Sequence, residues 1–182
     1  RNAVTAQAAF AAAEALTSPS SEGLTIARVD YADPVQGDAL FRLLDLYARD
    51  PAGGGTPLDP ALKAPLLAGL AATSGAFTLL AYIDGDAVGL ANCFTGFSTF
   101  AARPLVNIHD VAVDPAYRGR GIAKALFAQI EAVAREKGAV KITLEVLSGN
   151  EPAKALYRSL GYADYVLDPT QGTALFWQKA LY

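Results

Sequence analysis

The chain has 182 residues, of which 52% are hydrophobic and 18% are charged, and this composition excludes a disordered or fibrous protein. With 15 basic and 18 acidic residues the net charge is only −3, so neither a nucleic-acid-binding surface nor attachment to an anionic membrane is indicated, and a small molecule is the expected partner. Cys93 is the single cysteine, which rules out an internal disulfide and a four-ligand zinc spacing, so we expect no metal and a reducing, cytoplasmic environment.

Residues 1–22 are rich in alanine and contain one basic residue, Arg1. They lack the charged start and the leucine-rich centre of a secretory signal. We therefore expect a helix from Ala3 to Leu16, appended to one domain over 23–182, with a mobile tail as the alternative. The longest apolar stretches, such as 77–83, are well below the roughly 20 residues that cross a bilayer, so no membrane-spanning segment is expected.

The first part of the domain predicts one strand and two helices. The run 24–31 is typical of a strand, and Asp33 with Pro34 predicts the cap and first turn of the following helix. The apolar stripe of that helix consists of Leu40, Leu43, Leu44 and Tyr47. The glycines and prolines of 49–60 predict a mobile loop that gates a neighbouring site, and 60–72 predicts the second helix.

Three strands are predicted next, as a meander. Apolar runs at 76–83 and 87–100 flank an Asp-Gly turn at 84–86, which is the strongest short signal for a hairpin. The run 105–113 predicts the third strand, which ends at Asp114 and Pro115.

The remaining elements predict crossovers. One helix has an apolar face and C-terminal signals, formed by Ile122, Leu126, Ile130, Val133, Lys137 and Gly138. A strand over 139–147, a helix from Asn150 to Gly161 and two closing strands, the last over 174–181, complete the chain. This order requires a mixed sheet with helices on both of its faces.

The turn between the third strand and its helix has the composition of an anion site. The first N–H groups of a helix lack intrahelical acceptors and carry about half a positive charge. Gly119 and Gly121 remove the Cβ atoms that would keep phosphate oxygens away, and Arg118 and Arg120 add donors suited to phosphate. The turn therefore predicts a site for a phosphate or a pyrophosphate.

The turn has neither the P-loop pattern nor the dinucleotide-binding pattern. Its R-x-x-G-x-A pattern, at Arg118, Gly121 and Ala123, resembles the pyrophosphate loop of the GNAT superfamily of N-acetyltransferases. A second motif, 144–162, resembles the C-terminal part of that superfamily's core. Its matching residues are Asn150, Ala153, Tyr157, Leu160, Gly161 and Tyr162.

The resemblance implies an α/β fold with a mixed, mostly antiparallel sheet of about six to seven strands. It implies acetyl-coenzyme A as cosubstrate and, from family habit, a homodimer. The strand Val111, Ala112 and Val113 would pair with the pantetheine arm through its backbone. The cofactor-binding turn would comprise Arg118, Gly119, Arg120, Gly121, Ile122 and Ala123, with Asn150, Ala153 and Tyr157 from the second motif.

The resemblance also suggests catalytic residues. Tyr157 matches the usual general acid, since a phenol keeps its proton at neutral pH and can donate it to a thiolate. Glu145 stands where acetyltransferases of protein amines often carry a catalytic glutamate. His109 and Asp110 stand where polyamine acetyltransferases have an acidic pair, although His109 departs from that pattern. The general base is therefore Glu145, Asp110 or His109.

The expected function is acetyl transfer to the primary amine of a small molecule. Acetylation of protein N-termini or lysines is one alternative, and a non-catalytic regulatory domain that binds coenzyme A is another. Cys93 has no neighbour in its segment that would lower its pKa, so an acetyl-cysteine mechanism is not expected. Phe94, Phe97, Phe100, Tyr31 and Tyr47 are predicted as core residues, with a role in lining the acceptor pocket as the alternative.

Overall fold

A computed structural model describes residues 23–181 of the chain. It divides into two compact units that meet in the sequence between Thr143 and Leu144, and each is described by itself. The helix predicted from Ala3 to Leu16 lies outside the described residues. Among the described helices, none combines the length and the hydropathy that spanning a membrane would require.

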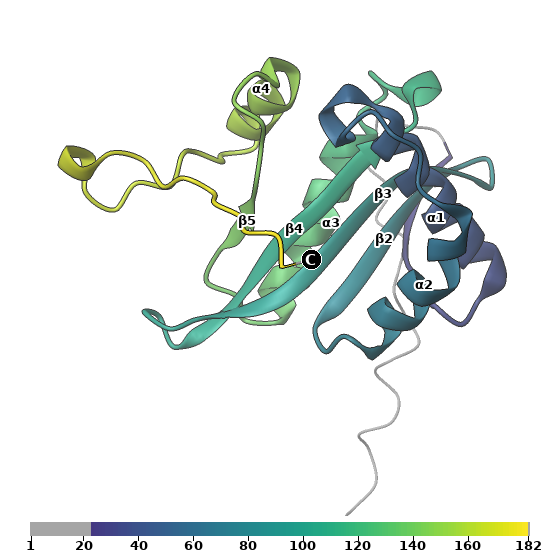
Figure 1. The fold of residues 1–182 in the computed structure, drawn as a ribbon, viewed down its shortest axis with the longest axis horizontal. Helices are drawn as coiled ribbons and strands as arrows, with labels where there is room; N and C mark the ends of the chain where they lie inside the picture. Colours follow the sequence, from purple (N-terminus) through teal and green to yellow (C-terminus); the bar gives the residue numbers. More distant parts are fainter. Residues whose placement is uncertain (1–22, 182) are drawn as a thin grey trace, which may run out of the picture. The chain divides into compact units, whose positions relative to one another are not determined.

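The first unit is built on a sheet whose strands follow the order of the chain, β1-β2-β3-β4-β5 (Figure 1). The strands are β1 Leu24–Arg28, β2 Ala76–Ile83, β3 Asp86–Ser98, β4 Arg103–Val113 and β5 Ile142–Leu144. Neighbours from β1 to β4 are antiparallel. Just before β5, Val140 N donates to Pro104 O, and Lys141 O accepts from Val106 N. The residue numbers of the bonded groups increase in the same direction on both segments, so β4 and β5 run parallel.

Helices cover both faces of this sheet, as predicted (Figure 1). The α-helices are α1 Pro34–Arg49, α2 Lys63–Ala72, α3 Ile122–Glu136 and, in the second unit, α4 Glu151–Ser159. Short 3-10 turns occur at η1 Pro51–Gly53, η2 Pro60–Leu62, η3 Pro115–Tyr117 and η4 Pro169–Gln171. Helices α1 and α2 pack on one face around Leu40, Leu43 and Leu80, and α3 packs on the other.

Local sequence signals explain where these elements begin and end. The Asp33 carboxylate accepts hydrogen bonds from the N–H groups of Val35 and Gln36, which caps α1 as predicted. The turn between β2 and β3 places Asp84 and Gly85 at φ 52° and 89°, the left-handed conformations that an Asp-Gly hairpin turn requires. The predicted cap and hairpin turn are both confirmed.

Helix α3 packs closely on the sheet at Gly89, where an added Cβ atom would make contacts tighter than ordinary van der Waals packing. A Cβ atom at this position would lie 3.0 Å from Ile122 Cγ2, 3.2 Å from Leu126 Cδ1 and 3.3 Å from Ala81 Cβ. Ile122, Leu126 and Ile130 are fully buried, which confirms most of the predicted apolar face. The close approach of α3 to β3 therefore depends on this glycine.

Replacing Gly89 by alanine is expected to destabilise the domain by about 1–3 kcal/mol, because the added methyl group overpacks the contact between α3 and the sheet. The control is Gly69→Ala, at a position inside α2 where no other described atom lies within 4 Å of the Cβ position. That change is expected to be neutral or stabilising, since alanine favours helix. Chemical denaturation measures both, and a Gly89 variant as stable as the wild type would contradict this packing.

The sheet has five strands and not the predicted six to seven. Strand β5 covers only Ile142–Leu144 of the predicted 139–147, and no helix or strand beyond η4 follows α4 in the described residues, so both predicted closing strands are wrong. Apolar residues of the last segment are exposed, with Phe176 at 74% and Trp177 at 82%. A strand needs a paired neighbour, and this segment's backbone bond from Ala174 N to Tyr165 O does not extend into a ladder.

Two further predictions need correction. Strand β1 ends at Arg28 and not at Tyr31, because Asp33 N donates to Asp30 O in a turn that leads into α1. Phe94 packs against the core, but Phe97 and Phe100 are 62% and 93% exposed on the β3–β4 hairpin. They lie beyond the part of the sheet that the helices cover, so they are not core residues.

Candidate active site

The turn that leads into α3 has the geometry expected of an anion site. Gly119 and Gly121 adopt φ 80° and 77°, a left-handed conformation that residues with a side chain rarely adopt. No other described atom lies within 4 Å of the Cβ position of either glycine, so both face open space. Within residues 23–181 no side chain caps the N-terminus of α3. The first N–H groups of α3 are therefore left for a ligand.

The arginines of this turn are held by different partners. Arg118 Nη2 lies 3.2 Å from Asp50 Oδ2, and its Nε donates to Val113 O at 3.4 Å. The Arg120 guanidinium lies over the Tyr117 ring, 5.1 Å from its centroid. Both arginines are exposed, and an anion can replace the contact between Arg118 and Asp50.

The loop after α1 begins at the same ion pair. The Asp50 carboxylate caps η1 by accepting from Ala52 N at 2.9 Å. These hydrogen bonds, first from Ala52 and then from Arg118, hold the pKa of Asp50 below its usual value. The loop also folds back on α1 through Thr56 N to Ala48 O and Leu58 N to Asp45 Oδ1. The predicted loop thus starts beside the anion site and has a defined path.

Strand β4 carries the predicted site residues that precede the turn. Its register against β3 shifts between Asn92 and Cys93, so that Asn92 faces Asp110 and Cys93 faces Ile108. His109 is therefore the extra residue of a β-bulge. Val111, Ala112 and Val113 continue the strand, half-buried, up to the turn. The strand backbone, Asp110 and the anion site thus belong to one continuous segment.

The acidic and basic candidates of β4 differ in their surroundings. Asp110 is half-buried and accepts a hydrogen bond from Asn92 Nδ2 at 2.9 Å. His109 is exposed, and its ring stands edge-on to Phe94 with the centroids 5.6 Å apart. Asp110 is thus held in a fixed orientation by a buried donor, which makes it the better placed proton acceptor of the two.

The remaining predicted residues belong to the second unit. Asn150 caps α4, accepting from Ala153 N at 3.2 Å, as its motif predicts. Tyr157 lies on α4, half-buried, and its ring is 6.3 Å from that of Tyr162. Glu145 follows β5 and is exposed. Asp110 and the anion site thus lie on one continuous segment of the first unit, whereas Tyr157 and Glu145 are placed only within the second.

Cys93 does not have the environment of a nucleophile. It is 1% exposed, and burial, with the charge of Asp110, raises the pKa of its thiol to about 12. A protonated buried thiol is not reactive.

Sequence reasoning missed the polar residues that support Asp110. Thr78 and Asn92 are 0% and 3% exposed, and they interrupt otherwise apolar strands. This interruption is a signal that the sequence does contain. Arg42 on α1 donates to Ala87 O and lies 3.7 Å from Asp114, the residue that caps η3.

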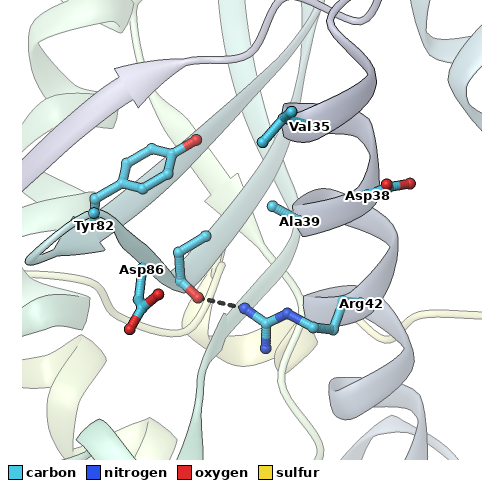
Figure 2. A pocket seen from close by; sticks show the side chains of 8 residues that line it. Val35, Asp38, Ala39, Arg42, Tyr82 and Asp86 are labelled. Carbon is cyan, nitrogen blue, oxygen red and sulfur yellow. Dashed lines mark hydrogen bonds between the residues drawn. The ribbon is translucent and has the colours of Figure 1, made fainter.

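A shallow pocket lies where α1 meets the β2–β3 hairpin, and Figure 2 shows Arg42 reaching across it to the backbone of β3. Its volume is about 270 Å³, and its lining residues are Val35, Asp38, Ala39, Arg42, Tyr82, Gly85, Asp86 and Ala87. None of the predicted site residues lines it. Among the described residues no cluster of His, Cys, Asp and Glu side chains suits a metal ion.

Comparison with known families identifies the fold. The model of the acetyltransferase (GNAT) family matches residues 40–162. The chain belongs to the GNAT family. The match begins within α1 and runs through α4, and so includes the anion site, Asp110 and Tyr157 of this GNAT chain.

Individual relatives agree with this assignment. Streptothricin acetyltransferase of Streptomyces lavendulae is 40% identical over 54% of this chain and 51% of its own length. The N-alpha-acetyltransferase RimI of Mycobacterium tuberculosis is 37% identical over 44% of this chain and 51% of its own length. The chain thus spans about half the length of the curated relatives that it matches. A crystal structure of an aminoglycoside acetyltransferase from a soil metagenome, solved with sisomicin, shares the fold with a TM-score of 0.68, at 20% identity over 87% of this chain and 98% of its own.

Proposed function

We propose that this GNAT chain transfers the acetyl group of acetyl-coenzyme A to a primary amine of a small molecule. The observation that carries the proposal is the oriented carboxylate of Asp110 on β4, the strand that leads directly into the anion site. One continuous segment thus holds a proton acceptor and a binding site for a pyrophosphate. Membership of the family supports acetyl-coenzyme A as the cosubstrate.

The residues present fit this cosubstrate. The N–H groups of 119–123 and the Arg118 and Arg120 guanidinium groups would hold the pyrophosphate, because the glycines leave the space in front of them open. The backbone of Val111 and Val113 would pair with the pantetheine arm. Asn150 and Ala153 would contribute through the second motif, as the family resemblance implies.

The transfer forms a bond from the amine nitrogen to the carbonyl carbon and breaks the bond from that carbon to sulfur. In our proposal Asp110 accepts the proton that the amine loses. Tyr157 donates a proton to the departing thiolate, a role that the sequence motif supports. A backbone N–H near Val111 stabilises the negative charge on the carbonyl oxygen. Glu145 and His109 are the competing proton acceptors.

Two relatives point to different acceptors. The match to streptothricin acetyltransferase favours a small amine, and the match to an N-alpha-acetyltransferase favours a protein N-terminus as the second candidate. The discriminating assay compares spermidine, lysine, an aminoglycoside and streptothricin with a peptide that begins with alanine. We expect kcat/KM to be at least about tenfold higher for one of the small amines. The peptide as the best substrate would favour the second candidate, and binding of coenzyme A without any transfer would favour a regulatory domain.

Replacing both Arg118 and Arg120 by alanine is expected to weaken coenzyme A binding by about tenfold for each charge-assisted hydrogen bond that the change removes. The difference should shrink at high salt, because both side chains are exposed. The matched control is Arg135→Ala at the other end of α3, where the arginine pairs with Glu131. Calorimetric titration measures all three proteins, and a double variant with the wild-type Kd would contradict this placement of the pyrophosphate.

A further inference from the structure

A row of hydrogen-bonded polar side chains crosses the sheet and ends on Asp110. Tyr31 OH and Thr78 Oγ1 are 2.9 Å apart. Thr78 Oγ1 donates to Asn92 Oδ1 at 2.7 Å, and Asn92 Nδ2 donates to Asp110 Oδ2 at 2.9 Å. Thr78 on β2 pairs directly with Asn92 on β3, and Asn92 pairs directly with Asp110 on β4. We call these side chains, Tyr31, Thr78 and Asn92, the polar row.

The direction of every bond in the polar row is fixed. The Thr78 hydroxyl has one hydrogen, and it goes to Asn92 Oδ1. Tyr31 must therefore donate to Thr78, because the same hydrogen cannot serve two acceptors. The Asn92 amide then has its oxygen occupied and its NH2 group directed at the carboxylate, which only accepts. Each donor thus points toward Asp110.

The polar row contributes little to the stability of the fold, so its presence suggests a role other than packing. Thr78 and Asn92 are 0% and 3% exposed and sit among fully buried leucines of β2 and β3, such as Leu80 and Leu90. Buried polar groups contribute little net stability even when they are paired. The row ends on a half-buried carboxylate, and no Lys or Arg side chain of residues 23–181 forms an ion pair with it. Asp110 is therefore oriented by a neutral donor, Asn92, and not by a cationic side chain of these residues.

Among the described residues, the other groups near Asp110 form no ion pair with it. Tyr47 lies on α1, and burial, then the charges of Asp110 and Asp50, raise the pKa of that phenol. Cys93 lies on β3, where burial, then the charge of Asp110, raises the pKa of its thiol. His109 precedes Asp110 on β4, with its ring against Phe94. Asn92 is thus the group that orients the carboxylate.

We propose that Asn92 and Thr78 are positioning residues of the transfer reaction, which orient the Asp110 carboxylate toward the acceptor amine. The inference rests on the proposed function. Asn92 acts directly, by donating to the carboxylate. Thr78 acts one step away, by fixing the Asn92 amide in the orientation that donates, and Tyr31 fixes the Thr78 hydroxyl in turn.

The Thr78 hydroxyl holds the Asn92 amide in its donating orientation, so removing that hydroxyl loosens the orientation of the Asp110 carboxylate. The test variant is Thr78→Val, which keeps the shape of the side chain and removes the hydroxyl. We expect kcat for the amine to fall by about tenfold while KM for acetyl-coenzyme A stays within about twofold, because misplacing a reacting group slows the chemical step without weakening cofactor binding. Hydrogen exchange of the Asn92 side-chain NH2 group, followed by NMR without substrate, is expected to become faster. Tyr31→Phe, a milder change at the end of the polar row, is expected to change both by less.

Thr95 provides the matched control. Its hydroxyl is also buried, on β3, and has no hydrogen-bond partner among the described residues. Thr95→Val makes the same chemical change outside the polar row, so kcat and the Asn92 exchange rate are expected to stay at their wild-type values. Thr78→Ser, which restores the hydroxyl, is expected to return both toward those values.

Three results would overturn the inference: unchanged kcat and unchanged Asn92 exchange in Thr78→Val and Tyr31→Phe, the same fall in kcat in Thr95→Val, or a fall in Thr78→Ser as large as in Thr78→Val. The last two would mean that packing and not the hydroxyl matters. Should the wild-type protein acetylate no amine, the proposed function fails, and the NMR exchange measurement still decides whether the polar row fixes the Asn92 amide.

Discussion

Replacing Asp110 by asparagine is expected to lower kcat/KM for the amine by about 10²–10⁴-fold, because the variant keeps the size of the side chain and loses the proton acceptor. The affinity for coenzyme A should stay within about twofold, since the phosphate-binding groups lie in the following turn. Steady-state kinetics and calorimetry measure the two effects separately. Asp86→Asn serves as the control for removal of a negative charge, because Asp86 is an exposed residue at the start of β3.

The competing base is tested in the same experiment. If Glu145→Gln or His109→Gln abolishes turnover while Asp110→Asn keeps it, the proton acceptor has been assigned to the wrong residue. The exposed positions of Glu145 and His109, compared with the oriented carboxylate of Asp110, are the reason that we expect the opposite result.

Tyr157→Phe is expected to lower kcat by about 10²-fold and to leave the affinity for coenzyme A unchanged. The change removes only the hydroxyl that would donate a proton to the thiolate. Tyr162→Phe is the matched control, because its ring is 6.3 Å from that of Tyr157 and belongs to the same unit. Rapid-quench kinetics separates the chemical step from product release. Full activity in Tyr157→Phe would show that the thiolate leaves without help from this residue.

The parts of the fold that the sequence predicts correctly depend on short-range signals. The Asp33 cap, the Asp-Gly turn at 84–86 and the buried face of α3 are each defined by residues within a turn or two of one another. The glycines of the anion site belong to this group, because their left-handed conformation is a local property. Local patterns were therefore sufficient for α1, the β2–β3 hairpin and the conformation of the glycine turn before α3.

What the sequence did not predict depends on pairing between distant segments. Residues 174–181 have the composition of a strand. A strand forms only where it can pair with the edge of another strand, and a local pattern does not specify that partner. The polar row was missed for a related reason. Thr78, Asn92 and Asp110 become neighbours only through the register of three strands, and the bulge at His109 sets that register. The appended helix, the homodimer and the cytoplasmic setting stay predictions.

The most direct test of the proposed cosubstrate site compares calorimetric titrations of the protein with coenzyme A and with pantetheine, which lacks the diphosphate and the nucleotide. If the glycine turn before α3 binds the diphosphate, the Kd of pantetheine is expected to be at least about 100-fold higher than the Kd of coenzyme A. Equal affinities for the two compounds would contradict this site, because the turn would then make no contribution to binding.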